Sequence, residues 1–207
     1  MEARNAYDRK PGGYVKTPTV FQMENTECGA ASLTMVLAYF GKFMPLEQVR
    51  IETGVSRDGC NAKNIMKAAR NLGLEAHGFR KSVEGLLKLP VPCIIHWNFN
   101  HFVVFEGVKG NDYYINDPAK GRRKLTLEDM DGCFTGVAMA FGVTDAFKKS
   151  PKEDRLMGLI KERLKGEGPA LLSLVVTGLF LVVPGMLTPV YSQVFIDDIL
   201  IGGNKDW

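Results

Sequence analysis

Helical spacing of apolar residues dominates the first half of the chain. The pattern predicts a first helix with apolar residues at i, i+3, i+4 and i+7 that ends at Gly41. A short second helix is expected between Pro45 and Gly54. A third follows the capping residue Asn61 and stops at Gly73. The apolar positions that define the first and third helices are Leu33, Val36, Leu37 and Phe40, and Ile65, Ala68, Ala69 and Leu72.

Shorter apolar runs, separated by turn residues, dominate from residue 75 to residue 143. They predict six strands, and Lys109-Gly110-Asn111 is typical of a hairpin turn. Thr126, with Asp129 three residues later, forms a capping box that predicts one short helix. The predicted fold class is therefore α+β, a helical lobe followed by an antiparallel sheet lobe. The expected strands are 75–80, 92–97, 101–108, 112–116, 122–125 and 137–143.

A long uncharged segment sets the last part of the chain apart. Residues 168–196 are 29 positions without one charged side chain, whereas a membrane helix needs about 20 predominantly apolar residues. Pro184 and Pro189 predict a bend in its second half. The alternative is a buried helix of a soluble core, but such helices rarely stay uncharged over this length. We therefore expect a membrane-spanning helix within residues 169–207.

Basic residues gather immediately before this segment. Residues 146–168 carry seven Lys or Arg and four acidic residues, whereas Lys205 is the one basic residue after the segment. The positive-inside rule then places residues 1–145 on the cytosolic side of the cell membrane. Within 146–168 a stripe of Leu and Ile favours either a helix on the membrane surface or a solvated linker helix. The expected domains are 1–145, a basic linker or interfacial helix at 146–168, and a transmembrane helix at 169–207.

Composition narrows the protein class further. Of the 207 residues 45% are hydrophobic and 24% charged, which excludes a collagen-like or wholly disordered chain. A net charge of +3 is too small to indicate nucleic-acid binding. The GxxxxGK[ST] phosphate loop is missing, so we expect no ATP-binding domain on this chain. The four cysteines lack CxxC spacing, so we expect free thiols in a reducing cytosol. The first 17 residues hold no apolar run, so we expect no signal peptide. The cysteines are Cys28, Cys60, Cys93 and Cys133.

One set of polar residues is arranged for nucleophilic catalysis. Cys28 stands where a polar loop meets the first helix, and a thiol at a helix N-terminus ionises more easily. A thiolate needs a base, and that base needs an orienting group. His101 opens a predicted strand, and Asp117 closes the strand that returns from the hairpin turn. Their even separation of sixteen residues puts both on one face of a symmetric hairpin centred near Lys109.

Gln22 adds a fourth group, six residues before the cysteine. Its side-chain amide is placed to donate to an oxyanion together with the backbone N–H of Cys28. Taken singly, these residues also fit a surface Gln, a buried structural Cys and a strand-end Asp. The set of amide, thiol, imidazole and carboxylate favours catalysis. His96 lies at odd spacing from His101, which argues against a shared zinc site.

These motifs together resemble a known family. Gln22-x5-Cys28-Gly29, His101 and Asn116-Asp117-Pro118 are similar to the bacteriocin-processing cysteine peptidase domain of peptidase-containing ABC transporters. The resemblance covers roughly residues 15–145 and looks most like the subgroup that exports peptides with nitrile-hydratase-like leaders. It implies a papain-like two-lobe fold and removal of a leader peptide after a Gly-Gly or Gly-Ala type site, coupled to export.

The same resemblance assigns roles and partners. It implies that Cys28 is the nucleophile, His101 the base, Asp117 its orienting group and Gln22 part of the oxyanion hole, without metal or organic cofactor. The implied partners are a precursor peptide with an N-terminal leader, the membrane and the rest of an ABC transporter, but no nucleic acid. Residues 169–207 would be the first of that transporter's membrane helices, with a single-span anchor as the alternative.

Two other functions stay open at this stage. One is a non-catalytic docking module that holds the leader for an exporter, although related modules of that kind lack the catalytic Cys. The other is a Cys-His-Asp acyltransferase, in which an amine acceptor replaces water. Incubation with a candidate precursor peptide separates cleavage, binding alone and acyl transfer.

Overall fold

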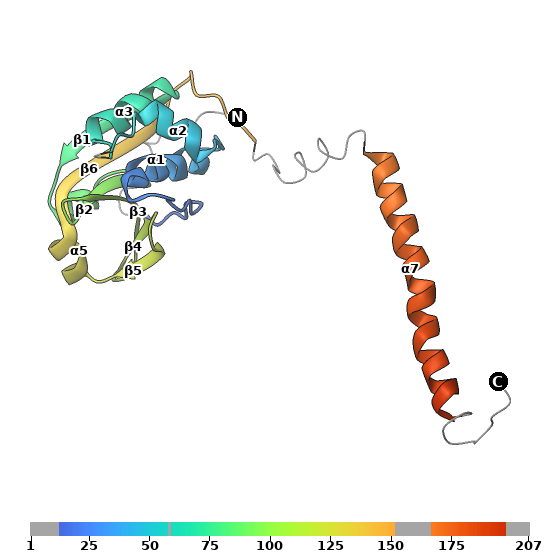
Figure 1. Ribbon diagram of the computed structural model, residues 1–207. Coiled ribbons are helices and arrows are strands. Elements are labelled where there is room, and N and C mark those ends of the chain that lie inside the picture. The colour runs from blue at the N-terminus through green and yellow to red at the C-terminus, as the bar shows by residue number, and fades with distance from the viewer. Residues whose placement is uncertain (1–12, 58, 152–166, 198–207) are drawn as a thin grey trace. The chain divides into compact units, whose positions relative to one another are not determined.

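Six strands form one sheet in the order β1-β6-β2-β3-β4-β5, and all neighbouring strands run antiparallel (Figure 1). The computed structural model describes residues 13–57, 59–151 and 167–197, and the chain divides into two units, Met1–Lys152 and Glu153–Trp207. The sheet belongs to the first unit. Its strands are β1 (Leu74–Arg80), β2 (Cys93–Trp97), β3 (His101–Lys109), β4 (Asp112–Asp117), β5 (Gly121–Leu125) and β6 (Phe134–Val143).

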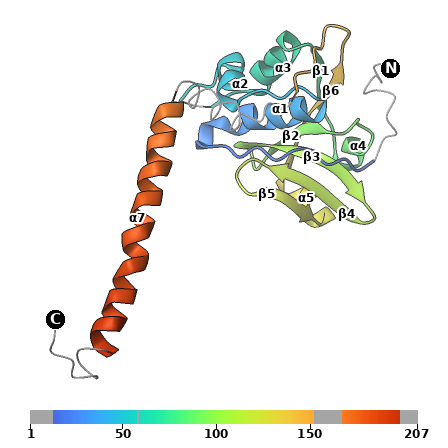
Figure 2. The same ribbon diagram turned by 90° about the vertical axis from the view of Figure 1, so that its right-hand side faces the viewer.

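Helices cover both faces of this sheet (Figures 1 and 2). Three of them, α1 (Cys28–Tyr39), α2 (Leu46–Thr53) and α3 (Ala62–Asn71), pack together, and α1 lies against β3. Every residue of α1 except Tyr39 is buried, because α2, α3 and the sheet surround it. The opposite face carries a second apolar core beneath the short helices α4 (Val83–Leu86) and α5 (Leu127–Cys133). The predicted α+β class is confirmed.

The helix ends form where the sequence predicts them. Asn61 caps α3, since its side chain accepts a hydrogen bond from the backbone N–H of Asn64 at 2.8 Å. Gly54 ends α2 with φ of 60°, a left-handed conformation that glycine adopts at little cost. The capping box of Thr126 and Asp129 starts α5. The sequence pattern predicts neither the helix α4 nor the 3-10 turn η2 (Asn25–Glu27) that precedes α1.

The β3–β4 hairpin differs from the symmetric one predicted. Lys109 pairs with Asp112 across a two-residue turn, but farther along Val104 pairs with Asn116. One extra residue in β3, Glu106, shifts the register between these two pairs as a β-bulge does. The prediction of a symmetric hairpin is therefore wrong, and the bulge decides which side chains share a face.

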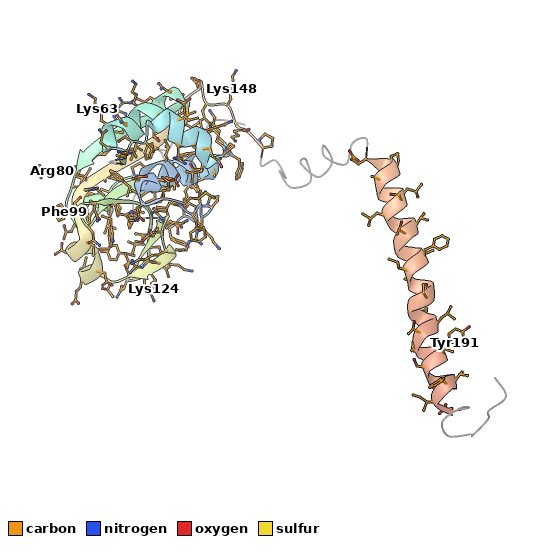
Figure 3. The ribbon with its side chains drawn as sticks, viewed as in Figure 1. Lys63, Arg80, Phe99, Lys124, Lys148 and Tyr191 are labelled. Carbon is orange, nitrogen blue, oxygen red and sulfur yellow. The ribbon has the colours of Figure 1, made fainter. Side chains whose placement is uncertain are left out.

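The second unit contains the uncharged segment as one continuous helix, α7 (Gly168–Val194). Pro184 and Pro189 lie inside it and leave it undivided (Figure 1). The apolar side chains that the structure describes in this helix are exposed, among them Tyr191 (Figure 3). By length and composition this helix is able to cross a membrane. The predicted surface or linker helix within 146–168 falls mostly outside the described residues.

Candidate active site

Cys28 is the first residue of α1, and its side chain is only 6% exposed. The sulfur of Cys60 lies beside the same helical turn, because a Cβ atom added to Gly29 would collide with it. Burial, and then the charge of Cys28, raise the pKa of the Cys60 thiol to about 11. Cys60 therefore stays protonated near neutral pH. Among the cysteines, all four of which are free, only Cys28 begins a helix.

A buried carboxylate shapes the loop in front of Cys28. Glu27 is 1% exposed, and one of its oxygens pairs with Arg50 of α2 at 2.8 Å. Its other oxygen accepts the backbone N–H groups of Met23 and Glu24 at 2.8 and 3.1 Å. Buried charges are tolerated when they are paired and hydrogen-bonded in this way. The buried Glu27 side chain thus holds the conformation of the loop before Cys28, a role that the sequence pattern does not predict.

His101 and Asp117 meet at one end of the sheet. Nε2 of the imidazole lies 2.8 Å from Oδ1 of the carboxylate, and the two side chains are 18% and 4% exposed. The same Oδ1 accepts the backbone N–H of Ala119 at 2.8 Å, which holds the carboxylate in place. The side chain of Cys28 lies near enough to act on the imidazole, since it helps to raise the pKa of His101. Because Nε2 faces Asp117, the nitrogen left for the thiol is Nδ1.

The electrostatics of this arrangement favour a charged imidazole. Burial alone would lower the pKa of His101, but the hydrogen bonds to Asp117 and Cys28 and the charges of both outweigh it and raise that pKa to about 9. Burial would raise the pKa of Asp117, but the bonds from His101 and from the backbone lower it overall. The pair therefore holds an imidazolium beside a carboxylate near neutral pH.

Gln22 is tied to the strand end that carries Asp117. Its backbone N–H donates to the carbonyl oxygen of Pro118 at 3.0 Å. Its side-chain Oε1 is buried and has no hydrogen-bond partner among the described residues. A buried amide left unpaired is costly unless something else satisfies it. Gln22 also lines a cavity of about 390 Å³, whose other lining residues are Asn25, Trp97, Asn98, Asn100, His101, Asp117, Ala119, Lys120 and Arg123.

The structure thus brings all four predicted site residues to one region. The cavity is rimmed by the β2–β3 turn, where Asn98 and Phe99 have positive φ angles and Phe99 is 83% exposed (Figure 3). His96 belongs to β2, pairs with Phe102 and bonds Thr135, so it lies on the face opposite His101. Among the described residues no three His, Cys, Asp or Glu side chains gather as a metal site requires.

Comparison with known families decides the class. The profile of the Peptidase C39 family matches residues 16–145, well over half of the chain. The chain belongs to the Peptidase C39 family. This is a family of cysteine peptidases, and a thiol near an imidazole that is itself hydrogen-bonded to a carboxylate is the arrangement that such chemistry needs.

Solved structures of C39 peptidases share the fold. One is a double glycine motif protease from an AMS/PCAT transporter, in complex with the leader peptide. It is 59% identical, with a TM-score of 0.63 over 64% of this chain and 95% of that one. The peptidase domain of Streptococcus ComA, a bi-functional ABC transporter, is 24% identical with a TM-score of 0.57, over 60% of this chain and 97% of that one, and supports the fold alone.

Longer relatives extend beyond this C39 domain. A probable microcin-H47 secretion/processing ATP-binding protein and a colicin V secretion/processing ATP-binding protein, both from Escherichia coli, are each 32% identical over 92% of this chain. The chain spans about a quarter of these relatives, 27% of each.

Proposed function

We propose that this chain is the leader peptidase of a bacteriocin-type exporter, and that it cuts precursor peptides after a double-glycine or Gly-Ala site. The observation that carries the proposal is the His101–Asp117 hydrogen bond beside an open cavity, with the side chain of Cys28 near enough to raise the pKa of that imidazole. Support comes from the 59% identical double glycine motif protease, whose structure holds a leader peptide.

The chemistry follows from these contacts. The Cys28 thiolate, paired with the His101 imidazolium, attacks the carbonyl carbon of the residue before the scissile bond. The tetrahedral oxyanion is stabilised by the Gln22 amide and the Cys28 backbone N–H. The imidazolium then gives its proton to the leaving amine, and a thioester remains on Cys28. Water, deprotonated by the now neutral His101, hydrolyses that thioester and restores the pair. Asp117 stabilises the imidazolium and keeps a proton on Nε2, so that Nδ1 faces the thiol.

The setting of this reaction is a membrane transporter. We infer that α7 spans the cell membrane, with the peptidase unit on the cytosolic side, since basic residues precede the helix. The names of the longer relatives, secretion or processing ATP-binding proteins, support coupling of cleavage to export. We also propose that the precursor peptides carry nitrile-hydratase-like leaders.

Product analysis tests the proposal against its two rivals. The detergent-solubilised chain is incubated with precursor peptides whose cleavage site is Gly-Gly, Gly-Ala or Val-Val, with and without an added primary amine. We expect hydrolysis after Gly-Gly and Gly-Ala and none after Val-Val. Binding without cleavage would identify a docking module, and a leader joined to the added amine as the main product would identify an acyltransferase.

A further inference from the structure

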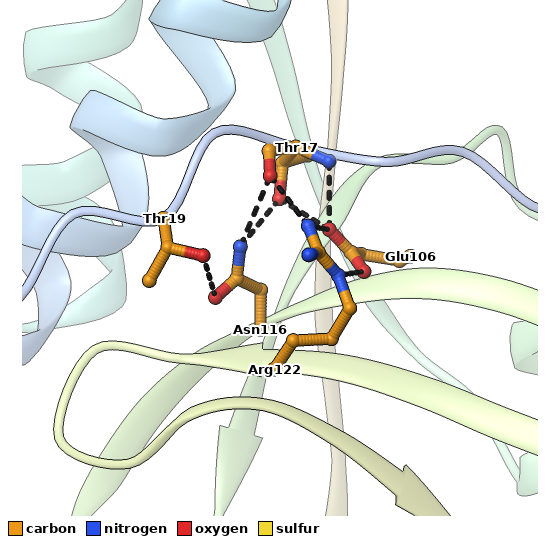
Figure 4. A network of polar contacts seen from close by, with 5 residues as sticks. All are labelled: Thr17, Thr19, Glu106, Asn116 and Arg122. Atoms are coloured by element: carbon orange, nitrogen blue, oxygen red, sulfur yellow. Dashed lines mark hydrogen bonds and ion pairs between the residues drawn. The ribbon is translucent and has the colours of Figure 1, made fainter.

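A β-bulge interrupts β3 between Phe105 and Gly107, on the strand that begins with His101. Glu106 is the extra residue there, and its side chain is fully buried. A carboxylate in this position must be compensated, because burying an unpaired charge is costly. Figure 4 shows how it is held, by a network of five side chains: Thr17, Thr19, Glu106, Asn116 and Arg122.

The centre of the network is a forked ion pair. Arg122 of β5 donates from Nε to one Glu106 oxygen at 2.6 Å and from Nη2 to the other at 2.9 Å (Figure 4). Two parallel hydrogen bonds hold the guanidinium and the carboxylate in one relative orientation and also pair their charges. The same Nη2 donates to the carbonyl oxygen of Thr17 at 2.7 Å. Glu106 Oε1 also accepts the backbone N–H and the hydroxyl of Thr17 at 2.7 and 2.6 Å.

The network continues to the residue beside Asp117. Asn116 is fully buried, and its Nδ2 donates to the hydroxyl of Thr17 at 3.0 Å. Its Oδ1 accepts the hydroxyl of Thr19 at 3.2 Å. The segment that carries these two threonines leads to Gln22, whose backbone binds Pro118. One buried cluster thus joins β3, β4, β5 and the loop of the proposed oxyanion donor.

The bulge decides whether the imidazole and the carboxylate can meet. Near the turn, Lys109 pairs with Asp112, three positions farther along the chain. In this register, two residues of β3 and β4 whose side chains lie on the same face of the sheet are separated by an odd number of positions. His101 and Asp117 are sixteen apart and would lie on opposite faces in that register. Beyond Glu106, Val104 pairs with Asn116, the separations become even, and both side chains share a face. A single inserted residue therefore creates the His101–Asp117 contact.

We propose that Glu106, held by Arg122 and Thr17, is a positioning residue that sets the register of β3 against β4 and thereby aligns the His101–Asp117 pair. The inference rests on the proposed function, since it deepens the account of that same site. Thr17 contributes a hydroxyl that links the bulge to Asn116. Loss of that hydroxyl loosens Asp117 while leaving the ion pair intact.

The test separates the hydroxyl's hydrogen bonds from its packing. Thr17→Val keeps the shape and removes the hydroxyl, whereas Thr17→Ser keeps the hydroxyl. Arg122→Lys keeps the charge and removes the fork. Asp112→Asn is the matched control, because Asp112 of β4 forms a surface ion pair with Lys124 at 2.8 Å, on the same strand β5 that carries Arg122.

Two readouts are measured on the full chain in detergent: the imidazole pKa of His101 by NMR, and the pH profile of kcat and KM for leader cleavage. The titratable groups acting on His101 are Cys28 of α1 and Asp117 of β4, and His96 of β2 senses its charge. We expect Thr17→Val and Arg122→Lys to move that pKa from about 9 toward 6.5, and to lower kcat by roughly tenfold or more with little change in KM. Thr17→Ser and Asp112→Asn should match wild type.

The outcomes distinguish this inference from the proposed function. If wild type cleaves and Thr17→Val titrates and turns over like Thr17→Ser, the positioning role is wrong and the peptidase stands. If wild type cleaves no leader while Thr17→Val still lowers the pKa, the register argument stands and the function fails. Loss of the fold in Thr17→Val, seen by circular dichroism, would also overturn the positioning role, because the network would then hold the domain rather than the site.

Discussion

Replacement of Asp117 by Asn removes one charge from the site with the least change in shape. The asparagine Oδ1 can still accept the N–H of Ala119, so the turn after β4 is kept. The imidazolium of His101 loses the carboxylate 2.8 Å away. In the opposite amide orientation, which gives up the Ala119 bond, the asparagine side chain would donate to Nε2. That would leave the proton on Nδ1, facing the thiol, so that His101 could not act as a base.

The structure gives the size of the effect. The His101 pKa of about 9, against an ordinary value of 6.5, corresponds to about 3 kcal/mol in favour of the imidazolium. Asp117 and Cys28 together contribute more than this net figure, because burial opposes them. An equal share for Asp117 is therefore at least about 1.5 kcal/mol, or roughly tenfold or more in the population of the ion pair. Loss of the correct tautomer adds to this, up to about 10⁴ in kcat.

The assay is kcat/KM for leader cleavage as a function of pH. A raised folded-state pKa means that the charged pair is intact below it and is lost as pH rises through about 9, so wild type should lose activity there. Asp117→Asn should lose activity at a lower pH, displaced toward 6.5, and should be slower at its optimum. The control is Asp112→Asn, the same change at the exposed end of β4. An unchanged alkaline limb in Asp117→Asn would refute the assignment of the His101 pKa to this carboxylate.

Three further predictions follow from the site and from α7. Gln22→Ala should lower kcat by roughly 10²–10³, the usual effect of one oxyanion donor, while Cys28 is still alkylated by iodoacetamide; unchanged turnover would remove the oxyanion role. Cys60→Ser should keep turnover within about tenfold of wild type. Peptide mapping of wild type after alkylation at pH 7.5 should find Cys28 labelled but neither Cys60 nor Cys93, because burial raises the pKa of these two thiols to about 11 and about 12. The full chain should sediment with membranes and enter solution only with detergent, whereas a chain ending at residue 151 should stay soluble; a full chain in the high-speed supernatant without detergent would argue against a membrane span.

Much of the fold is legible in the sequence, because its elements are local. Helix caps such as Asn61 and the hairpin turn before Asp112 act over a few residues, and both form as predicted. The uncharged run is longer, but it is continuous along the chain and forms the helix α7. The four-residue helix α4 is not predicted by the pattern, because a single helical turn has too few positions to show a helical repeat of apolar residues. The sheet order was not predictable in the same way. It depends on pairs such as β1 with β6, which are far apart along the chain.

The residues of the site were predictable from the sequence, but the register of β3 against β4 that brings His101 to Asp117 was not. His101 and Asp117 were expected to share a face for the wrong reason, because one inserted residue leaves no periodic signal. One charged residue within an apolar stretch was the available clue, because Glu106 follows four apolar residues. Glu27 ends a polar loop directly before Cys28, so its burial leaves no comparable signal. Both are buried and paired, with Arg122 and Arg50. A charge inside an apolar strand indicates a buried ion pair, because burying it unpaired would be costly.

The most direct test of the central claim compares wild type with Cys28→Ala on one synthetic precursor whose leader ends in a glycine pair, with Cys60→Ala as the matched cysteine control. Intact-mass spectrometry measures the products, and fluorescence anisotropy measures leader binding. The account predicts a single cut after the second glycine by wild type and by Cys60→Ala, and no cut by Cys28→Ala, which still binds the leader. Cleavage at the same bond by Cys28→Ala would contradict it.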